Sequence, residues 1–155
     1  MNTVRICILF MFLPGLTIAQ APELTQQQEL LTRDCKNVRG HAGRVVEEAS
    51  QSELNAALAR AHAGEVVKNL RAMEQQLQSV RKLYTKEQLG LVGAEQASME
   101  KTCATLKDLA GRLEQELKKE NPDRLQARKI AVELRAEMNK GYDAHQRMKK
   151  SLGMK

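Results

Sequence analysis

Residues 85–123, TKEQLGLVGAEQASMEKTCATLKDLAGRLEQELKKENPD, decide the fold of this chain. Their apolar residues recur at alternating steps of three and four, which is the spacing of one face of an α-helix. Thr85 and Gln88 form a capping-box pattern at the start of the stretch, and the Asn-Pro-Asp triplet at 121–123 supplies a helix start at its end. The stretch therefore predicts a long helix over about 86–119, followed directly by another.

The same stepping continues on both sides of this stretch. It predicts long helices over about 52–84 and 122–152 and a shorter N-terminal helix over about 26–49, where Thr25 and Gln28 form another capping-box pattern. No strand pattern interrupts the helices, so we expect an all-α antiparallel bundle. The break between the first two helices contains no glycine or proline, and a single bent helix there is an alternative.

The N-terminal stretch 1–19, MNTVRICILFMFLPGLTIA, has the layout of a secretory signal peptide. Arg5 precedes an apolar run over 6–13, and small residues lead up to Ala19. The run is shorter than the roughly 20 residues that span a bilayer. We therefore expect cleavage after Ala19, leaving 20–155 as a single helical-bundle domain that is exported to the periplasm, if the source is bacterial, or secreted.

Charge and aromatic content limit the partners that we expect. The net charge of +6 falls to +5 when Arg5 leaves with the signal peptide, an excess that suits acidic protein clients or simple solubility. Tyr84 and Tyr142 are the aromatic residues that remain, which is too few to stack single-stranded nucleic acid. We expect no nucleic-acid partner. The basic run at 147–150 is typical of a solvated helix end, with peripheral membrane contact as the alternative.

Two cysteines lie on the apolar stripes of the first and third predicted helices. Counting outward from each turn places Cys35 and Cys103 at one level of the bundle. An exported chain favours a disulfide between them, but only if the first helix packs directly beside the third. Two buried free thiols are the alternative.

A polar layer is predicted by the same counting, because Gln96 falls opposite His145 on the facing stripes. A glutamine and a histidine can satisfy each other and fix the helix register. The functional alternative is a layer that senses pH or metal, since imidazole titrates near neutrality.

Candidate chemistry elsewhere is sparse. His41 and His62 fall close in level, near Asp108, and these three side chains are the metal-ligand candidates, although no metal-binding spacing supports them. No nucleophile elbow, phosphate loop or pocket-forming loop is present. We expect no enzymatic activity, no cofactor and no metal.

Two short segments resemble the LTxxQ motif of bacterial periplasmic stress proteins and small helical chaperones. The first is LTQQQ, with Leu24, Thr25 and Gln28 at the motif positions, and the second is YTKEQ, with Thr85 and Gln88. The resemblance implies a chaperone that works without ATP, or an accessory factor of envelope stress and metal resistance. It also implies a cradle-shaped antiparallel homodimer.

Two functions follow as hypotheses. One is an exported, non-enzymatic, chaperone-like protein that binds protein clients on an apolar surface bearing methionines. The other is a structural or interaction bundle without chaperone activity, such as a scaffold or a component of an envelope or secretion machine. Burial of Met73, Met99, Met138 and Met148 within one chain would favour the second.

Overall fold

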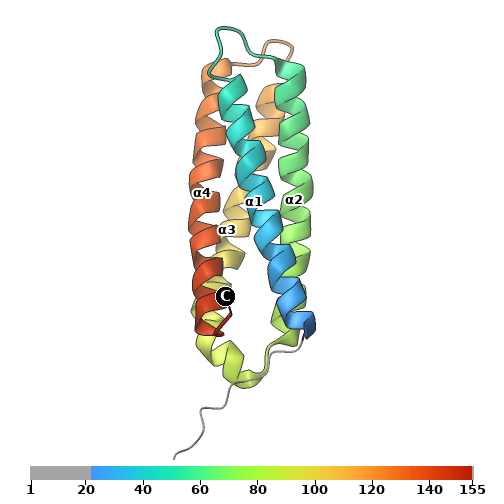
Figure 1. The fold of residues 1–155 in the computed structure, drawn as a ribbon. Coiled ribbons are helices and arrows are strands. Elements are labelled where there is room, and N and C mark those ends of the chain that lie inside the picture. The colour runs from blue at the N-terminus through green and yellow to red at the C-terminus, as the bar shows by residue number, and fades with distance from the viewer. Residues whose placement is uncertain (1–21, 155) are drawn as a thin grey trace, which may run out of the picture.

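The structure, a computed structural model, describes residues 22–154; the predicted signal peptide (1–19) and its cleavage site lie outside them. It consists of four α-helices, and none of the described residues forms a strand. The helices are α1 (Pro22–Glu48), α2 (Ala56–Leu83), α3 (Lys86–Lys118) and α4 (Arg124–Ser151). They run alternately up and down as a four-helix bundle, with α1 packed against α2 and α4 and diagonal to α3 (Figure 1).

The prediction of an all-α antiparallel bundle is confirmed, but the first helix differs from its predicted bounds. α1 has 27 residues, against 28 in both α2 and α4. It begins at Pro22, which suits the first turn of a helix because that turn needs no amide donor. Thr25 therefore lies inside the helix, and its pairing with Gln28 as a capping box is wrong.

N-terminal capping residues determine where α3 and α4 begin. The predicted box before α3 is confirmed: Thr85 Oγ1 accepts the Gln88 amide at 3.2 Å, and Gln88 Oε1 accepts the Thr85 amide at 2.9 Å. For α4 the N-cap is Asp123 rather than Asn121, because the Asp123 carboxylate accepts the Leu125 amide at 2.8 Å. The fourth helix thus starts two residues later than predicted.

A link over 49–55 separates α1 from α2, so the two are not one bent helix. Asn55 caps α2, its side chain accepting the Leu58 amide at 3.1 Å. Arg124 of α4 holds the link by donating to the carbonyl oxygens of Ala49 at 3.2 Å and Gln51 at 3.0 Å. Because the link is longer than predicted, α2 begins at residue 56 instead of 52, which changes the residues that face each other across the first two helices.

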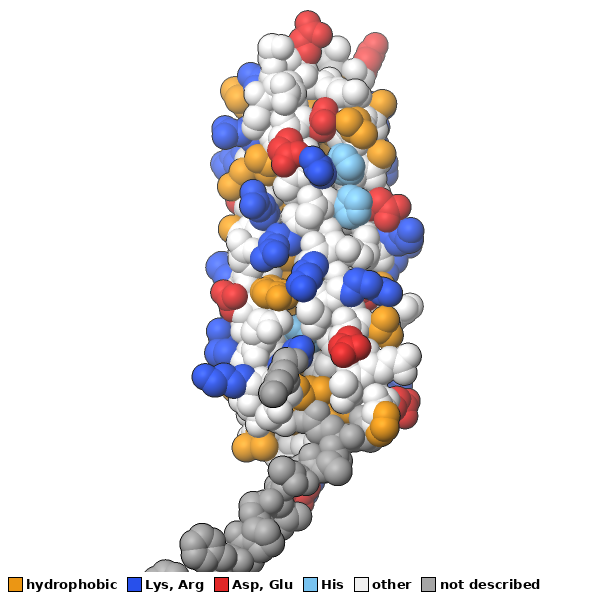
Figure 2. All heavy atoms as spheres, viewed as in Figure 1, with side chains coloured by type: hydrophobic (Ala, Val, Ile, Leu, Met, Phe, Trp, Pro, Cys, Tyr) orange, Lys and Arg blue, Asp and Glu red, His pale blue; other side chains and the backbone are white. Residues whose placement is uncertain are grey.

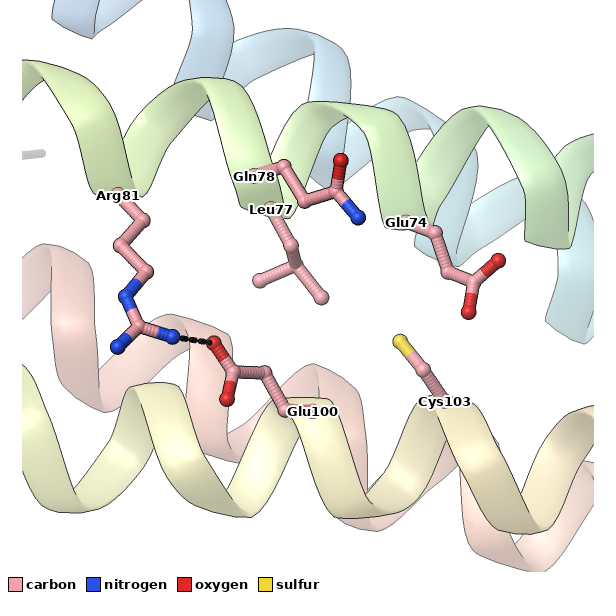
Figure 3. A pocket seen from close by; sticks show the side chains of 6 residues that line it. All are labelled: Glu74, Leu77, Gln78, Arg81, Glu100 and Cys103. Carbon is pink, nitrogen blue, oxygen red and sulfur yellow. Dashed lines mark hydrogen bonds and ion pairs between the residues drawn. The ribbon is translucent and has the colours of Figure 1, made fainter.

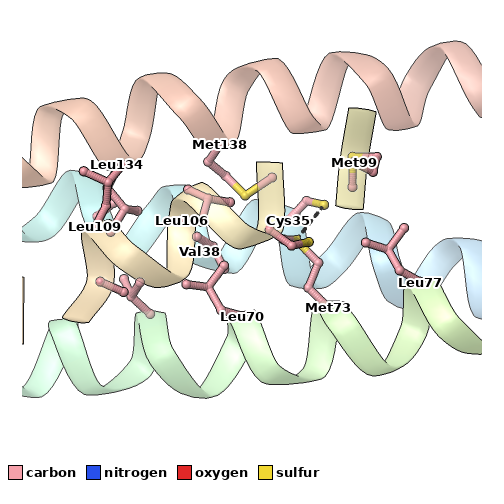
Figure 4. Packing of buried hydrophobic residues seen from close by; sticks show 14 of the residues in the cluster. Cys35, Val38, Leu70, Met73, Leu77, Met99, Leu106, Leu109, Leu134 and Met138 are labelled. Carbon is pink, nitrogen blue, oxygen red and sulfur yellow. Dashed lines mark hydrogen bonds between the residues drawn. The ribbon is translucent and has the colours of Figure 1, made fainter. Parts of the chain in front are cut away.

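The core lies between the four helices and is built from their apolar stripes (Figure 4). Leu31, Leu106 and Leu134 are fully buried, as are all four methionines of the stripes: Met73, Met99, Met138 and Met148. The three-and-four spacing of α3 includes Leu89 as a buried position, and this is wrong. Leu89 is 37% exposed, while the neighbouring Gln88, which forms the capping box, is buried.

Small residues bring neighbouring helices close together. A Cβ built on Gly141 of α4 would lie 2.8 Å from Thr102 Cγ2 of α3, so only glycine fits there at this helix separation. Ala42 of α1 and Ala63 of α2 are buried in the same way. No helix among the described residues is long and apolar enough to cross a membrane.

Candidate functional site

The two cysteines do not form the predicted disulfide. Both are buried free thiols. They lie on diagonal helices, and no Cα atom of α1 comes within 8 Å of one of α3, whereas bridged Cα atoms lie within about 7 Å. The Cys35 thiol instead donates to Met73 Sδ at 3.4 Å (Figure 4). Burial raises the pKa of Cys35 and that of Cys103 to about 12, which keeps both in the unreactive thiol form.

The predicted pairing of Gln96 with His145 is also wrong, although both side chains are buried. Gln96 Nε2 donates along its own helix to Glu100 Oε1 at 3.1 Å. His145 Nε2 lies 2.8 Å from Thr32 Oγ1 of α1. α4 packs against both α3 and α1, and the His145 side chain faces α1 rather than α3.

The hydrogen bonds around His145 fix its tautomer. Thr32 donates its hydroxyl proton to the Gln28 carbonyl at 2.9 Å, so the same hydroxyl accepts from His145 Nε2. The Nδ1 atom of His145 is then an unprotonated acceptor, buried without a partner. Burial, with Lys149 nearby on α4, lowers the pKa of His145 to about 4. At neutral pH this imidazole is uncharged.

Unsatisfied polar atoms gather at one end of the bundle. Like His145, five other side chains each bury an atom, here an oxygen, that has no partner among the described residues: Gln27, Gln28, Asp34, Gln76 and Gln96. All six lie in the half that contains the α2–α3 turn and the first residues of α1. A buried polar group without a partner costs about 1–3 kcal/mol, so we expect this half to be less stable than the half near the 49–55 link. We call it the polar half.

The two segments that resemble the LTxxQ motif meet in the polar half. Gln28 Nε2, from the first segment, donates to the hydroxyl of Tyr84, from the second, at 2.6 Å. Leu24 is buried beside them. Thr85 is exposed, but Leu24, Gln28 and Tyr84 are buried, so the two segments join the start of α1 to the turn between α2 and α3.

Two of the three metal-ligand candidates come together on the outer side of the α1–α2 contact. The Nδ1 atoms of His41 and His62 lie 3.2 Å apart, and Figure 2 shows two adjacent pale-blue histidines on this face. Asp108 does not join them, because it lies on α3, pairs with Arg112 at 3.8 Å and is mostly exposed. Among residues 22–154 no group of three histidine, cysteine, aspartate or glutamate side chains is placed to hold a metal.

A groove runs along the contact between α2 and α3, which pack less closely than the other neighbouring pairs. Three hollows of about 240, 150 and 100 Å³ follow one another along it. The apolar and small residues that line them are Ala63, Val67, Leu70 and Leu77 from α2 and Cys103, Ala110, Gly111 and Leu117 from α3. We refer to this feature as the α2–α3 groove.

Charged side chains border the groove and cross it as ion pairs. Arg81 of α2 donates to Glu100 of α3 at 2.9 Å (Figure 3). Lys107 of α3 donates to Glu74 of α2 at 3.0 Å. Cys103 points toward α2 between these two pairs. The groove thus has a largely buried apolar floor, with charged side chains of both signs along its rims.

No known protein family, curated protein or solved structure matches this chain. The resemblance to the LTxxQ proteins therefore rests on the quoted residues alone. The α2–α3 groove was not predicted from the sequence. The sequence feature that could have indicated it is the pair of small residues Ala110 and Gly111 in α3, which has charged residues of both signs nearby.

Proposed function

We propose that this chain is an exported, non-enzymatic interaction protein whose α2–α3 groove binds an amphipathic helix of another protein. The main support for this proposal is the position of the three hollows, which lie in one row along α2 between Arg60 and Arg81. That row spans about 30 Å at 1.5 Å per residue, the length of a helix of about 20 residues. An apolar floor with charged rims suits a helix with one apolar face.

Burial of the methionines favours this interaction role over a surface for unfolded clients. Met73, Met99, Met138 and Met148 are all fully buried. As long as the bundle stays closed, no methionine-bearing surface is available to a client. The interaction role is also the one expected of a scaffold or a component of an envelope or secretion machine.

The test fills the groove without disturbing the fold. Gly111 lines the groove, and a Cβ there meets no atom within 4 Å, so Gly111→Gln starts a side chain at the groove without a clash at Cβ. Gly90→Gln is the matched control, because it makes the same change on α3 outside the three hollows, also with no atom within 4 Å. A photo-crosslinker at Lys107, on the groove rim, is introduced into each protein in its native host.

We expect one crosslinked partner in the wild type and in Gly90→Gln and its loss in Gly111→Gln. A partner that crosslinks equally to all three proteins would contradict groove binding. The intact mass of the same exported protein tests the localisation, since cleavage after Ala19 predicts a chain that begins at Gln20.

A chaperone-like role is the second candidate, and the polar half favours it. If this half opens, the buried Met99 and Met148 become exposed to clients. Suppression of aggregation of a heated client, without ATP and at a near-stoichiometric ratio, would support this role. The absence of suppression at both pH 7 and pH 5 would leave the interaction role alone.

A further inference from the structure

His41 of α1 and His62 of α2 form a contact that the α2–α3 groove does not use. Their Nδ1 atoms are 3.2 Å apart, and their ring centroids 5.4 Å. Each histidine is half-buried and precedes a buried alanine, Ala42 or Ala63. Because these alanines are small, the two helices approach closely enough for the imidazoles to meet across them.

The separation of the two nitrogens matches that of two ligands of one metal ion. With no metal, one ring must hold a proton on Nδ1 and donate it to the other ring. If both rings are unprotonated at Nδ1, the two nitrogen lone pairs point into the same space between the rings. Imidazole nitrogens bound to a tetrahedral Zn²⁺ at about 2.0–2.1 Å lie about 3.3 Å from each other. We propose that His41 and His62 bind one divalent transition-metal ion, Zn²⁺ in particular, through their Nδ1 atoms.

The surroundings leave room for the other ligands of the ion. Gly40 and Gly43 of α1 and Gly64 of α2 flank the histidines, and a Cβ on any of them would meet no atom within 4 Å. The described residues offer no third histidine, cysteine or acidic ligand, so water completes the coordination. The site is therefore open, with two protein ligands, and binds zinc more weakly than a closed site of four protein ligands.

The local charges are compatible with a cation. Arg44, one turn after His41, is paired with Glu47 at 2.8 Å. Glu65, one turn after His62, is likewise paired, with Lys68 at 3.4 Å, so these two ion pairs add no net charge near the rings. Imidazole is a ligand type that zinc, copper and nickel share, and zinc is the ion whose tetrahedral geometry fits the observed separation.

The experiment titrates Zn²⁺ into the full exported chain by calorimetry at neutral pH, with the cysteines kept reduced. Wild type is compared with His41→Ala and His62→Ala. The control is Asn69→Ala, which removes the 3.1 Å hydrogen bond from Asn37 farther along the same contact between α1 and α2 and leaves both imidazoles in place. Circular dichroism of each variant verifies that the bundle is folded.

We expect the wild type and Asn69→Ala to bind one zinc per chain with similar affinity. The zinc affinity of each histidine variant should be at least tenfold lower. The ¹⁵N shifts of the imidazoles supply a second readout: zinc should move Nδ1 of His41 and His62 and leave His145 unchanged. The proposal is overturned if a folded histidine variant binds zinc as tightly as the wild type. Coordination through Nε2, or an equal loss of affinity in Asn69→Ala, overturns it as well.

Discussion

His145 lies in an environment that lowers its pKa well below the value in water. It is fully buried, donates from Nε2 to Thr32, and leaves Nδ1 without a partner. From α1 it faces the neutral Thr32 and the Gln28 carbonyl, and Lys149 of its own helix is the charged group that acts on it. Among residues 22–154 no carboxylate is paired with this imidazole, so a proton on His145 would be an uncompensated buried charge.

The low pKa of His145 predicts that acid destabilises the bundle. The pKa is about 4 in the folded chain and 6.5 when solvated, so the unfolded chain takes up the proton first. Stability is therefore complete above pH 6.5, falls as the pH drops toward 4, and levels off below that value. Between pH 6.5 and pH 5 the loss from this residue is about 2 kcal/mol.

Urea unfolding at pH 7 and pH 5 measures this loss. His145→Leu should remove it, while His62→Leu, on the half-buried surface, should retain it. An equal pH dependence in the wild type and His145→Leu would show that the native imidazole is not held neutral.

Cys35 and Cys103 are predicted to resist alkylation in the native protein. Only the thiolate reacts, and burial raises the pKa of both thiols to about 12. Mass spectrometry after iodoacetamide treatment should show no adduct at either cysteine in buffer and an adduct at both in urea. A crosslinked peptide under non-reducing conditions would contradict the free-thiol state.

At the scale of the helices, Gly141 sets the separation of α3 and α4. Gly141→Ala should destabilise the bundle by about 1–3 kcal/mol, because the new Cβ would lie 2.8 Å from Thr102 Cγ2 and 3.2 Å from Met138 Cε. The matched control is Gly93→Ala in α3, where a Cβ meets no atom within 4 Å. That change should stabilise the helix by up to about 1 kcal/mol. Thermal unfolding of the two variants tests this prediction. Equal changes in stability would contradict close packing at Gly141.

The helices themselves could be predicted from sequence because their apolar stripes carry a strong period. The capping box of Thr85 and Gln88 could be predicted too, since it depends on local chemistry alone. The start of α1 could not, because Pro22 and Thr25 are both acceptable at a helix N-terminus. Which residues face each other across α1 and α2 depends on the length of the 49–55 link, which neither glycine nor proline marks.

The candidate sites could be predicted only where they lie close to a turn. His41 and His62 are near the 49–55 link, so the number of residues from the link along each helix is enough to predict that they lie together. Cys35 lies farther away, and the later start of α2 brought Met73 to it. Helix periodicity shows that His145 is on the buried face of α4, but not which neighbouring helix it contacts. Its partner Thr32 therefore could not be predicted. The α2–α3 groove depends on how closely two whole helices pack, a property of all four helices together.

At the scale of the whole molecule, the bundle has one aliphatic half and one polar half. We predict that amide hydrogens near Gln28, Gln96 and His145 exchange faster than those near Val45 and Leu113. The unsatisfied buried atoms lower the local free energy of opening in the polar half. Hydrogen exchange read by mass spectrometry tests this, and uniform protection along all four helices would contradict it.

The arginine of α4 that holds the 49–55 link has a consequence for the order of folding. Arg124 bonds to carbonyl groups 75 and 73 residues earlier in the chain, and Arg128 reaches Ser50 across 78 residues. In a polypeptide that emerges N-terminus first, these bonds can form only after the last helix has been synthesised. Until then the link has only local contacts, such as the Asn55 cap, so its bonds to α4 are among the last to form.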